Sequence, residues 1–284
     1  VDFNAEIYVV STKFMVIESY GRVKPRFLYH VLTNKFALDE FQRIAESRSG
    51  TFPQITFESI EHFPIPVPPL SSQDVLIQFF DNLDSRINLL RETNSTLEDI
   101  AQALFKSWFV DFDPVHAKSE GKLPEGMDEA TAAIFPDVFE ETELGIVPRE
   151  WRISALSEIA NLNAASWSAR NAPSEVTYVD LAGVKNNAFD PLQSYLFSDA
   201  PSRARRILRS NDCIVGTVRP GNRSFGFITQ AENNLTASTG FAVLSPKQKD
   251  VAAFVYLCAT REANIDRLAS LADGGAYPAV KPEL

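Results

Sequence analysis

Arginine is the residue type whose pattern in this chain most directly suggests chemistry. The 284-residue sequence holds four arginines between Ser202 and Arg209, and two more with an asparagine between Thr217 and Ser224. A guanidinium group can donate two parallel hydrogen bonds to a phosphate or to the edge of guanine, and an asparagine amide can pair with the edge of adenine. These residue types predict contact with DNA. The predicted DNA-contacting residues are Arg203, Arg205, Arg206, Arg209, Arg219, Asn222 and Arg223.

A structural role is the alternative for the same arginines. Surface ion pairs with Asp199 and Asp212 would explain them without any nucleic acid. A Pro-Gly pair, however, places Arg219 and Arg223 on a tight loop between two expected strands, and such a loop projects side chains from a rigid base. The pattern therefore favours DNA contact for this loop, whereas both interpretations stay open for Arg203–Arg209.

Patterns that would indicate catalysis are weak. Asp113, with Glu120 and Lys122, loosely resembles the metal-binding constellation of some nucleases, but the segment is acidic and interrupted by prolines, so a solvated loop is favoured. The sequence has no Gly-rich phosphate loop and no Gly-x-Gly-x-x-Gly motif, and its three histidines lack the spacing of a zinc site. We therefore expect no catalytic residue, no metal site and no cofactor bound by this chain.

A long helix over residues 73–110 is the element expected to organise the chain. Apolar residues recur there at spacings of 4 and 3, a 3.5-residue period typical of a left-handed coiled coil. Neither proline nor glycine interrupts the run, so the helix would be about 50–60 Å long. The predicted coiled-coil interface comprises Leu76, Phe80, Leu83, Ile87, Leu90, Asn94, Leu97, Ala101, Leu104 and Trp108.

The polar Asn94 within this stripe is typical of a coiled-coil seam, where a single polar residue fixes register or partner. The alternative, a helix buried in one globular core, does not explain Asn94. No second run of this kind occurs in the sequence. We therefore expect a partner helix from outside the chain, or self-association through Leu76–Trp108.

An internal repeat organises the rest of the chain. Its two copies are offset by 227 residues, with a two-residue indel near the end. The matching stretches are Ser11–Ile17 with Ser238–Leu244, Phe27–Tyr29 with Phe254–Tyr256, and Gly50–Ile55 with Gly275–Val280. The sequence thus contains about one and a quarter copies of a long unit. We expect a fragment of a longer protein, in which a second rod would pair with the first.

The local patterns predict an α+β fold. Expected strands cover residues 11–18, 178–181, 213–218, 225–229 and 240–244, and expected helices cover 25–46, 156–160 and 252–271, with turns at 50–53 and 274–278. Residues 111–148 are rich in proline and acids, so we expect a mostly irregular connector with one short helix near 128–134.

Charge and cysteine usage narrow the class of protein. The net charge of −10 lies within residues 71–149, whereas 1–70 carries −1 and 150–284 carries +1. A local basic face on the nearly neutral flanking parts is therefore compatible with the acidic total. Cys213 and Cys258 lie in apolar surroundings, which predicts reduced thiols and a cytoplasmic protein. No apolar run approaches the length of a membrane span, so we expect no membrane partner.

The run Ala103–Pro114, Ala-Leu-Phe-Lys-Ser-Trp-Phe-Val-Asp-Phe-Asp-Pro, resembles the end of the central conserved region of the specificity (S) subunit of type I restriction–modification enzymes. The rod before it, the acidic connector up to Trp151, and Gly216–Arg223 are similar to that family too. The resemblance covers essentially the whole chain.

The resemblance implies two target-recognition domains joined by long helices that pair as an antiparallel coiled coil. Each domain would read one half of a split sequence in double-stranded DNA. It implies no catalysis in this subunit: a methyltransferase subunit using S-adenosylmethionine modifies adenine, and a separate motor-nuclease restriction subunit cuts. This chain departs from the family in lacking the start of the first recognition domain and the second helix.

Four domains follow from these arguments. We expect a remnant of the first target-recognition domain at residues 1–70, a coiled-coil spacer helix at 71–112, an acidic connector at 113–149, and an incomplete second target-recognition domain at 150–284. The expected function is sequence-specific DNA recognition within a type I restriction–modification complex. The alternative is a coiled-coil scaffold that binds only protein and does not read DNA.

Overall fold

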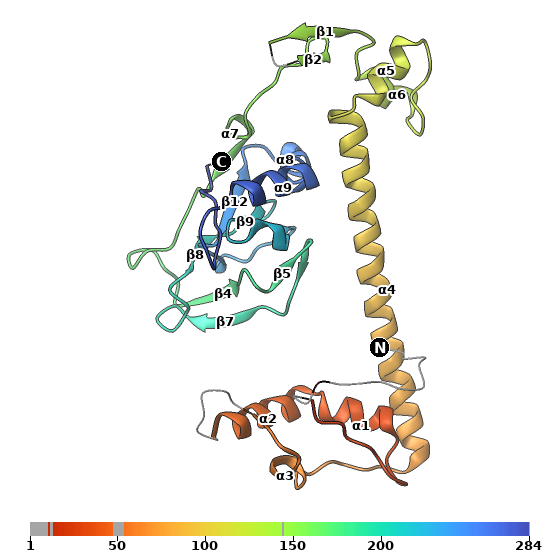
Figure 1. Ribbon diagram of the computed structural model, residues 1–284, viewed down its shortest axis with the longest axis vertical. Coiled ribbons are helices and arrows are strands. Elements are labelled where there is room, and N and C mark those ends of the chain that lie inside the picture. The colour runs from red at the N-terminus through yellow and green to blue at the C-terminus, as the bar shows by residue number, and fades with distance from the viewer. Residues whose placement is uncertain (1–10, 12–13, 48–53, 144, 284) are drawn as a thin grey trace. The chain divides into compact units, whose positions relative to one another are not determined.

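The computed structural model describes residues 11, 14–47, 54–143 and 145–283, and the statements below concern these residues (Figure 1). The chain forms two compact units, Val1–Thr96 and Leu97–Leu284. The boundary falls inside the longest helix, α4, which covers Leu70–Phe109. The predicted α+β class with a long helix is confirmed, because helices and β-sheets are both present and α4 runs for 40 residues.

Helix α4 forms where the sequence predicts the rod. Two prolines end the preceding extended segment, and the absence of glycine and proline thereafter leaves every backbone N–H available to the helix. Its length is about 60 Å at 1.5 Å per residue. Despite that length its polar residues are frequent, and among the described residues no helix combines the length and apolar character needed to cross a membrane.

Three short helices precede α4 in the first unit: α1 (Pro25–Leu32), α2 (Lys35–Ser47) and α3 (Phe57–Ile60). The prediction of one helix over 25–46 was wrong, because the chain breaks after Leu32. Thr33 Oγ1 donates to the Tyr29 carbonyl at 2.8 Å, which ends α1, and Asn34 Oδ1 accepts from the Ala37 N–H at 2.9 Å, which starts α2. Side chains that bond to the local backbone commonly stop one helix and start another.

The expected strand at residues 11–18 is also corrected. Residues 11 and 14–18 have no strand conformation, and residues 12–13 lie outside the described part. A strand needs a neighbour to pair its backbone groups, and the described residues of the first unit contain no other strand. The turn expected at 50–53 lies outside the described residues.

Gln73 fastens the segment before α1 to α4. Its side chain is completely buried and makes three hydrogen bonds. The Lys24 N–H donates to its Oε1 at 2.8 Å, and its Nε2 donates to the carbonyls of Arg22 and Pro68, both at 2.8 Å. A glutamine amide thus satisfies three backbone groups that would otherwise be buried without partners.

Two four-stranded sheets form the second unit. One sheet is antiparallel with the order β10-β9-β12-β3, and the other has the order β7-β4-β11-β8 with β4 and β11 parallel. The strands of the first sheet are β3 (Ala160–Leu162), β9 (Cys213–Gly216), β10 (Phe225–Phe227) and β12 (Phe241–Pro246), and those of the second are β4 (Glu175–Val179), β7 (Gln193–Leu196), β8 (Ala204–Ile207) and β11 (Leu235–Ser238).

Smaller elements complete the second unit. They are α7 (Leu156–Ile159), the hairpin β5 (Val184–Lys185) and β6 (Ala188–Phe189), the 3₁₀-helices η1 (Pro220–Asn222) and η2 (Lys249–Val251), and the helices α8 (Ala252–Thr260) and α9 (Glu262–Leu271). The expected strands at 178–181, 213–218, 225–229 and 240–244 correspond to β4, β9, β10 and β12 with shifted ends. The expected helix 252–271 is again two helices, and β8 forms inside the arginine run without having been predicted.

Strand β9 shows how the layers pack. Its residues Cys213 and Val215 face a cluster that includes Tyr256 of α8 and Ile265 of α9, whereas Ile214 belongs to the core of residues from β4, β9, β11 and β12. Successive strand residues point to opposite faces, so β9 is buried on both sides. This accounts for its uninterrupted apolar sequence. Cys213 is a free, buried thiol, and burial raises its pKa.

The internal repeat is visible in the helices. Helix α8 begins 227 residues after α1, and α9 begins 227 residues after α2. The end of α8 repeats the bond that ends α1, since Thr260 Oγ1 donates to the Tyr256 carbonyl at 2.8 Å. One helix-pair motif therefore occurs in each unit.

The connector after α4 is more ordered than the sequence predicts. It contains α5 (Asp113–Ser119), α6 (Glu129–Ala133) and the hairpin β1 (Phe139–Thr142) and β2 (Gly145–Pro148), so the expectation of a mostly irregular segment was wrong. The short helix expected near 128–134 is confirmed as α6. Aromatic residues explain the order: Trp108, Phe112, Phe139 and Trp151 pack around a small core centred on Val115 and Phe135.

The structure predicts that Gln73→Leu weakens the attachment of α1. The substitution leaves one N–H and two carbonyls without partners, which should cost about 2–4 kcal/mol. Amide hydrogen exchange should therefore show faster exchange at Lys24 and along α1. Gln78→Leu, at an exposed position of the same helix, is the matched control. Equal protection in both variants would contradict the role of Gln73.

Candidate nucleic-acid interface

The loop between β9 and β10 is held in an unusual backbone conformation. Arg219 and Arg223, which flank η1, have φ angles of 49° and 59° in the left-handed region. Such a conformation costs about 1–2 kcal/mol per non-glycine residue. The loop also begins tightly, because a Cβ at Gly216 would lie 2.9 Å from the Ser224 carbonyl oxygen. Strained loops of this kind are common at binding sites, where the surrounding structure fixes them.

Four cationic side chains meet at a cavity of about 640 Å³ beside this loop. Arg219 and Arg223 line it together with Arg203 and Lys185, which come from distant parts of the chain. The other polar residues that line it are Asp180, Asn222, Ser224 and Tyr277. The lining thus carries four positive charges and one negative charge, so its field attracts anions.

None of these four cations forms a salt bridge within 4.0 Å in the described part of the chain. The alternative of arginines paired with Asp199 and Asp212 is therefore wrong. Asp199 accepts a hydrogen bond from Ser198, and Asp212 accepts one from the Arg209 main-chain N–H at 2.7 Å.

The β5–β6 turn holds one of the arginines in place. Asn186 and Asn187 both have positive φ angles, as a two-residue hairpin turn requires. From this turn Asn186 Oδ1 accepts a hydrogen bond from Arg223 Nε at 2.9 Å. Neighbouring Lys185 lines the same cavity. The turn therefore both orients an existing cation and adds another.

The remaining predicted arginines do not line this cavity. The Arg205 guanidinium carbon lies 4.7 Å from the Phe197 ring centroid, and half-buried Arg206 donates to Ser166 Oγ at 3.4 Å. Arg209 lines a separate hollow of about 320 Å³ with Lys247 and Lys249. Because β8 alternates its side chains between two faces, neighbouring arginines along it cannot all point the same way.

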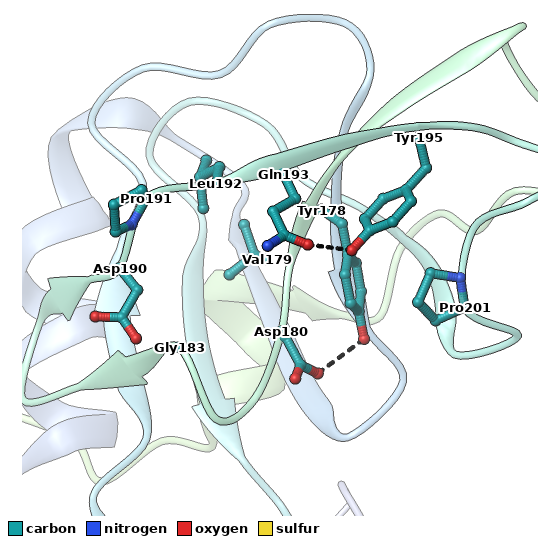
Figure 2. Close-up of a pocket in the computed structure, with 10 residues that line it drawn as sticks. All are labelled: Tyr178, Val179, Asp180, Gly183, Asp190, Pro191, Leu192, Gln193, Tyr195 and Pro201. Carbon is teal, nitrogen blue, oxygen red and sulfur yellow. Dashed lines mark hydrogen bonds between the residues drawn. The ribbon is translucent and has the colours of Figure 1, made fainter. Parts of the chain in front are cut away.

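A smaller hollow of about 280 Å³ adjoins the cationic cavity through Asp180, which lines both. Figure 2 shows Tyr178 donating to Asp180, at 3.0 Å, and Tyr195 donating to Gln193. Burial raises the pKa of Tyr178, and Asp180 raises it further, so the phenol stays protonated and donates. These polar groups can pair with hydrogen-bonding edges next to the cationic wall.

Sequence reasoning missed Lys185 and Tyr277. The signal for Lys185 was the Asn-Asn pair after it, which predicts a hairpin turn that displays its neighbours. Tyr277 follows a Gly-Gly pair, which indicated a turn but gave no information about the surface it meets. Both residues reach the cavity through long-range packing.

The predicted coiled-coil stripe lies mostly exposed along α4. Leu83 is 44% exposed and Leu90 is 55% exposed, and Leu76, Phe80, Ile87, Leu97 and Leu104 are similar. The stripe ends differently, because Trp108 packs against Phe135 at 5.7 Å in the connector core. Within the described residues nothing covers the stripe between these ends, and an apolar strip of this size indicates an interaction surface.

One group of described residues has the composition of a metal site. Ligand atoms of His30, Asp81 and Asp84 lie within 4.8 Å of one another. The Arg26 guanidinium already contacts both carboxylates, at 2.7 Å and 3.8 Å, and supplies the positive charge there. In the expected solvated loop, Asp113 accepts from Ser107 and Glu120 pairs with Lys122, so the nuclease-like pattern has local partners.

The chain is similar to known specificity subunits. Residues 1–99 match the family model of the type I restriction modification DNA specificity domain. The chain is 36% identical over 248 residues to the specificity subunit of the type I restriction enzyme HindI from Haemophilus influenzae, covering 83% of this chain and 52% of that protein. The specificity subunit of MjaIX from Methanocaldococcus jannaschii is 25% identical over 162 residues, covering 57% and 32% respectively.

Among solved structures, a type I restriction–modification S subunit from M. genitalium aligns over 88% of this chain and 57% of that chain, with 14% identity and a TM-score of 0.37. The sequence comparisons carry the assignment. They confirm the resemblance to type I specificity subunits predicted from Ala103–Pro114. The chain spans about half the length of the HindI subunit and about a third of the MjaIX subunit.

The contacts of Arg205 predict a structural role for it. Arg205→Ala removes the stacking on Phe197 and should lower the free energy of unfolding by about 1 kcal/mol. Arg203→Ala, two residues away at an exposed position of the cavity, should change it by less than about 0.5 kcal/mol. Urea unfolding of both variants measures the difference. Equal losses would mean that Phe197 does not restrain Arg205.

Proposed function

We propose that this chain is the sequence-reading part of a type I restriction–modification complex and binds double-stranded DNA through the cationic cavity. The observation that carries this proposal is the meeting of Lys185, Arg203, Arg219 and Arg223 at one cavity without carboxylate partners, in a chain similar to specificity subunits. Cations kept unpaired in this way repel one another. A bound polyanion removes that repulsion, which supports a phosphate-rich ligand.

The residues divide by what they can contact. Arg219 and Asn222, on the projecting loop, have side chains suited to the edges of guanine and adenine. Arg203, Arg223 and Lys185 serve as phosphate contacts, which set register and supply salt-dependent affinity. Arg205 and Arg206 stabilise the fold around β8, and Arg209 with Lys247 and Lys249 forms a separate, weaker contact with the backbone.

The chain itself performs no catalysis in this proposal. It directs a methyltransferase subunit, which binds S-adenosylmethionine and modifies adenine, and a motor-nuclease restriction subunit to a split target sequence. The whole complex works in the cytoplasm, where the free thiols of Cys213 and Cys258 stay reduced. The residue ranges 1–70 and 150–284 act as parts of two target-recognition domains, with 71–112 as spacer and 113–149 as connector.

The apolar stripe of α4 is the proposed surface for helix pairing. Its 3.5-residue period and its exposed leucines support a second helix of the same kind as the occupant. Either a second copy of this chain or another conserved helix provides it. Asn94, in the middle of the stripe, would select one register.

Methylated-adenine mapping tests the DNA-reading role. The chain, combined with its methyltransferase subunit, should direct methylation to one defined motif. Arg219→Ala should relax one position of that motif, since a base contact is worth about 1–3 kcal/mol. Arg203→Ala is the matched phosphate variant, and it should weaken binding to all sequences and lower the salt slope by about 1.

Two results would contradict the proposal. If the complex is stable but methylates no defined motif and shows no salt-dependent DNA affinity, the chain is a protein-binding scaffold, which is the rival function. If Arg219→Ala weakens every sequence equally, the base-reading role of Arg219 fails while DNA binding stands.

Charge placed on the stripe tests helix pairing. The double variant Leu83→Glu, Leu90→Glu should abolish self-association, because each dimer seam would bury charges without partners. The double variant Asn82→Glu, Leu89→Glu adds the same charge outside the stripe and should leave association unchanged. Sedimentation at several protein concentrations distinguishes them. A wild-type chain that is monomeric at every concentration would exclude self-association and leave a partner helix as the occupant.

A further inference from the structure

The loop that carries Arg219 is bound along its length by a second turn near residues 273–279. Val218 and Ala279 form a β-bridge. The Arg219 N–H donates to the Pro278 carbonyl at 2.7 Å, and the Val280 N–H donates to the Thr217 carbonyl at 2.9 Å. Main-chain bonds of this kind place the two loops in a fixed register, independent of side chains.

The second turn is itself closed. Asp273 and Ala279 exchange hydrogen bonds in both directions, with N to O distances of 3.1 Å and 2.9 Å. Gly274 has a φ of +119°, which side-chain-bearing residues rarely adopt. The turn therefore presents the residues between them, including Tyr277, from a rigid base.

Tyr277 meets Arg219 at the edge of the cationic cavity. Its side chain is 72% exposed, so it contributes little to the core. The Arg219 guanidinium carbon nevertheless lies 4.6 Å from the centroid of its ring, and Arg219 Nη2 donates to the Ala276 carbonyl at 2.5 Å. The turn thus contacts the guanidinium at one face and at one N–H, and the Arg219 side chain makes no other hydrogen bond among the described residues.

We propose that Tyr277 is a positioning residue that fixes the guanidinium plane of Arg219 for reading a base. This inference rests on the proposed DNA-reading function and deepens it. A flexible arginine must lose rotamer freedom when it binds a base edge, and a guanidinium already stacked on an aromatic ring loses less. Tyr277 therefore acts on the strength of one base contact and on the preference at that base pair.

The internal repeat gives independent support. Gly275-Ala276-Tyr277-Pro278 matches Gly50-Thr51-Phe52-Pro53, so the first copy also has an aromatic residue before the proline. The structure of Gly50–Pro53 lies outside the described residues. Both copies keep the ring, whereas the hydroxyl is present only in Tyr277, and a stacking role requires only the ring.

The test compares Tyr277→Leu with Tyr277→Phe in the full chain, bound to its methyltransferase subunit. Affinities are measured for a duplex with the mapped methylation motif and for duplexes with single base-pair changes. Tyr277→Leu should weaken cognate binding about 3- to 30-fold, the range of a cation–π contact. It should leave non-cognate binding, the salt slope and the thermal midpoint unchanged, and Tyr277→Phe should behave as wild type.

A double-mutant cycle with Arg219→Ala completes the test. If Tyr277 acts through Arg219, Tyr277→Leu has no further effect once Arg219 is alanine. Independent, multiplicative effects would overturn the positioning role, as would equal weakening of all duplexes or a Tyr277→Leu variant that binds like wild type. A wild-type complex without any sequence preference would overturn the proposed function and this role with it.

Discussion

An apolar stripe that has no cover within the described chain is the constraint on which the structure depends. Helix α4 is continuous for 40 residues and belongs to both compact units, yet most of its seam leucines remain exposed. Leaving these side chains in water forfeits roughly 25 cal/mol for each Å² of apolar surface. A helix that occupies the stripe recovers this free energy, so helix pairing and the chain's stability are linked.

The repeated helix pair contacts α4 through different chemistry in each unit. In the first unit the contacts are polar: Gln73 bonds to backbone groups, and Arg26 pairs with Asp81. In the second unit Phe254 of α8 lies 5.3 Å from Phe105 and 5.2 Å from Phe109 of α4, measured between ring centroids. One ancestral motif has therefore been fitted to two surfaces by changing side chains while the helix boundaries stayed in place.

The cationic cavity shows how the second unit prepares an anion-binding surface. Its charges come from a hairpin turn, from the segment before β8 and from the loop after β9, and each backbone is fixed by hydrogen bonds rather than by salt bridges. Neutral restraints such as Asn186 and Tyr277 orient the guanidinium groups without cancelling their charge. Full charge thus remains for a ligand, which a carboxylate partner would have reduced.

The sequence by itself determined the long helix, the helix pair and the loop with Arg219 and Arg223. These follow from local rules: a 3.5-residue period, a repeat with its own caps, and a Pro-Gly turn between apolar strands. Tertiary structure decided the rest. The strand β8 turned Arg205 and Arg206 away from the cavity, aromatic packing ordered the connector, and long-range contacts brought in Lys185 and Tyr277. The direction of a side chain and its distant neighbours depend on how strands pair, which no local pattern specifies.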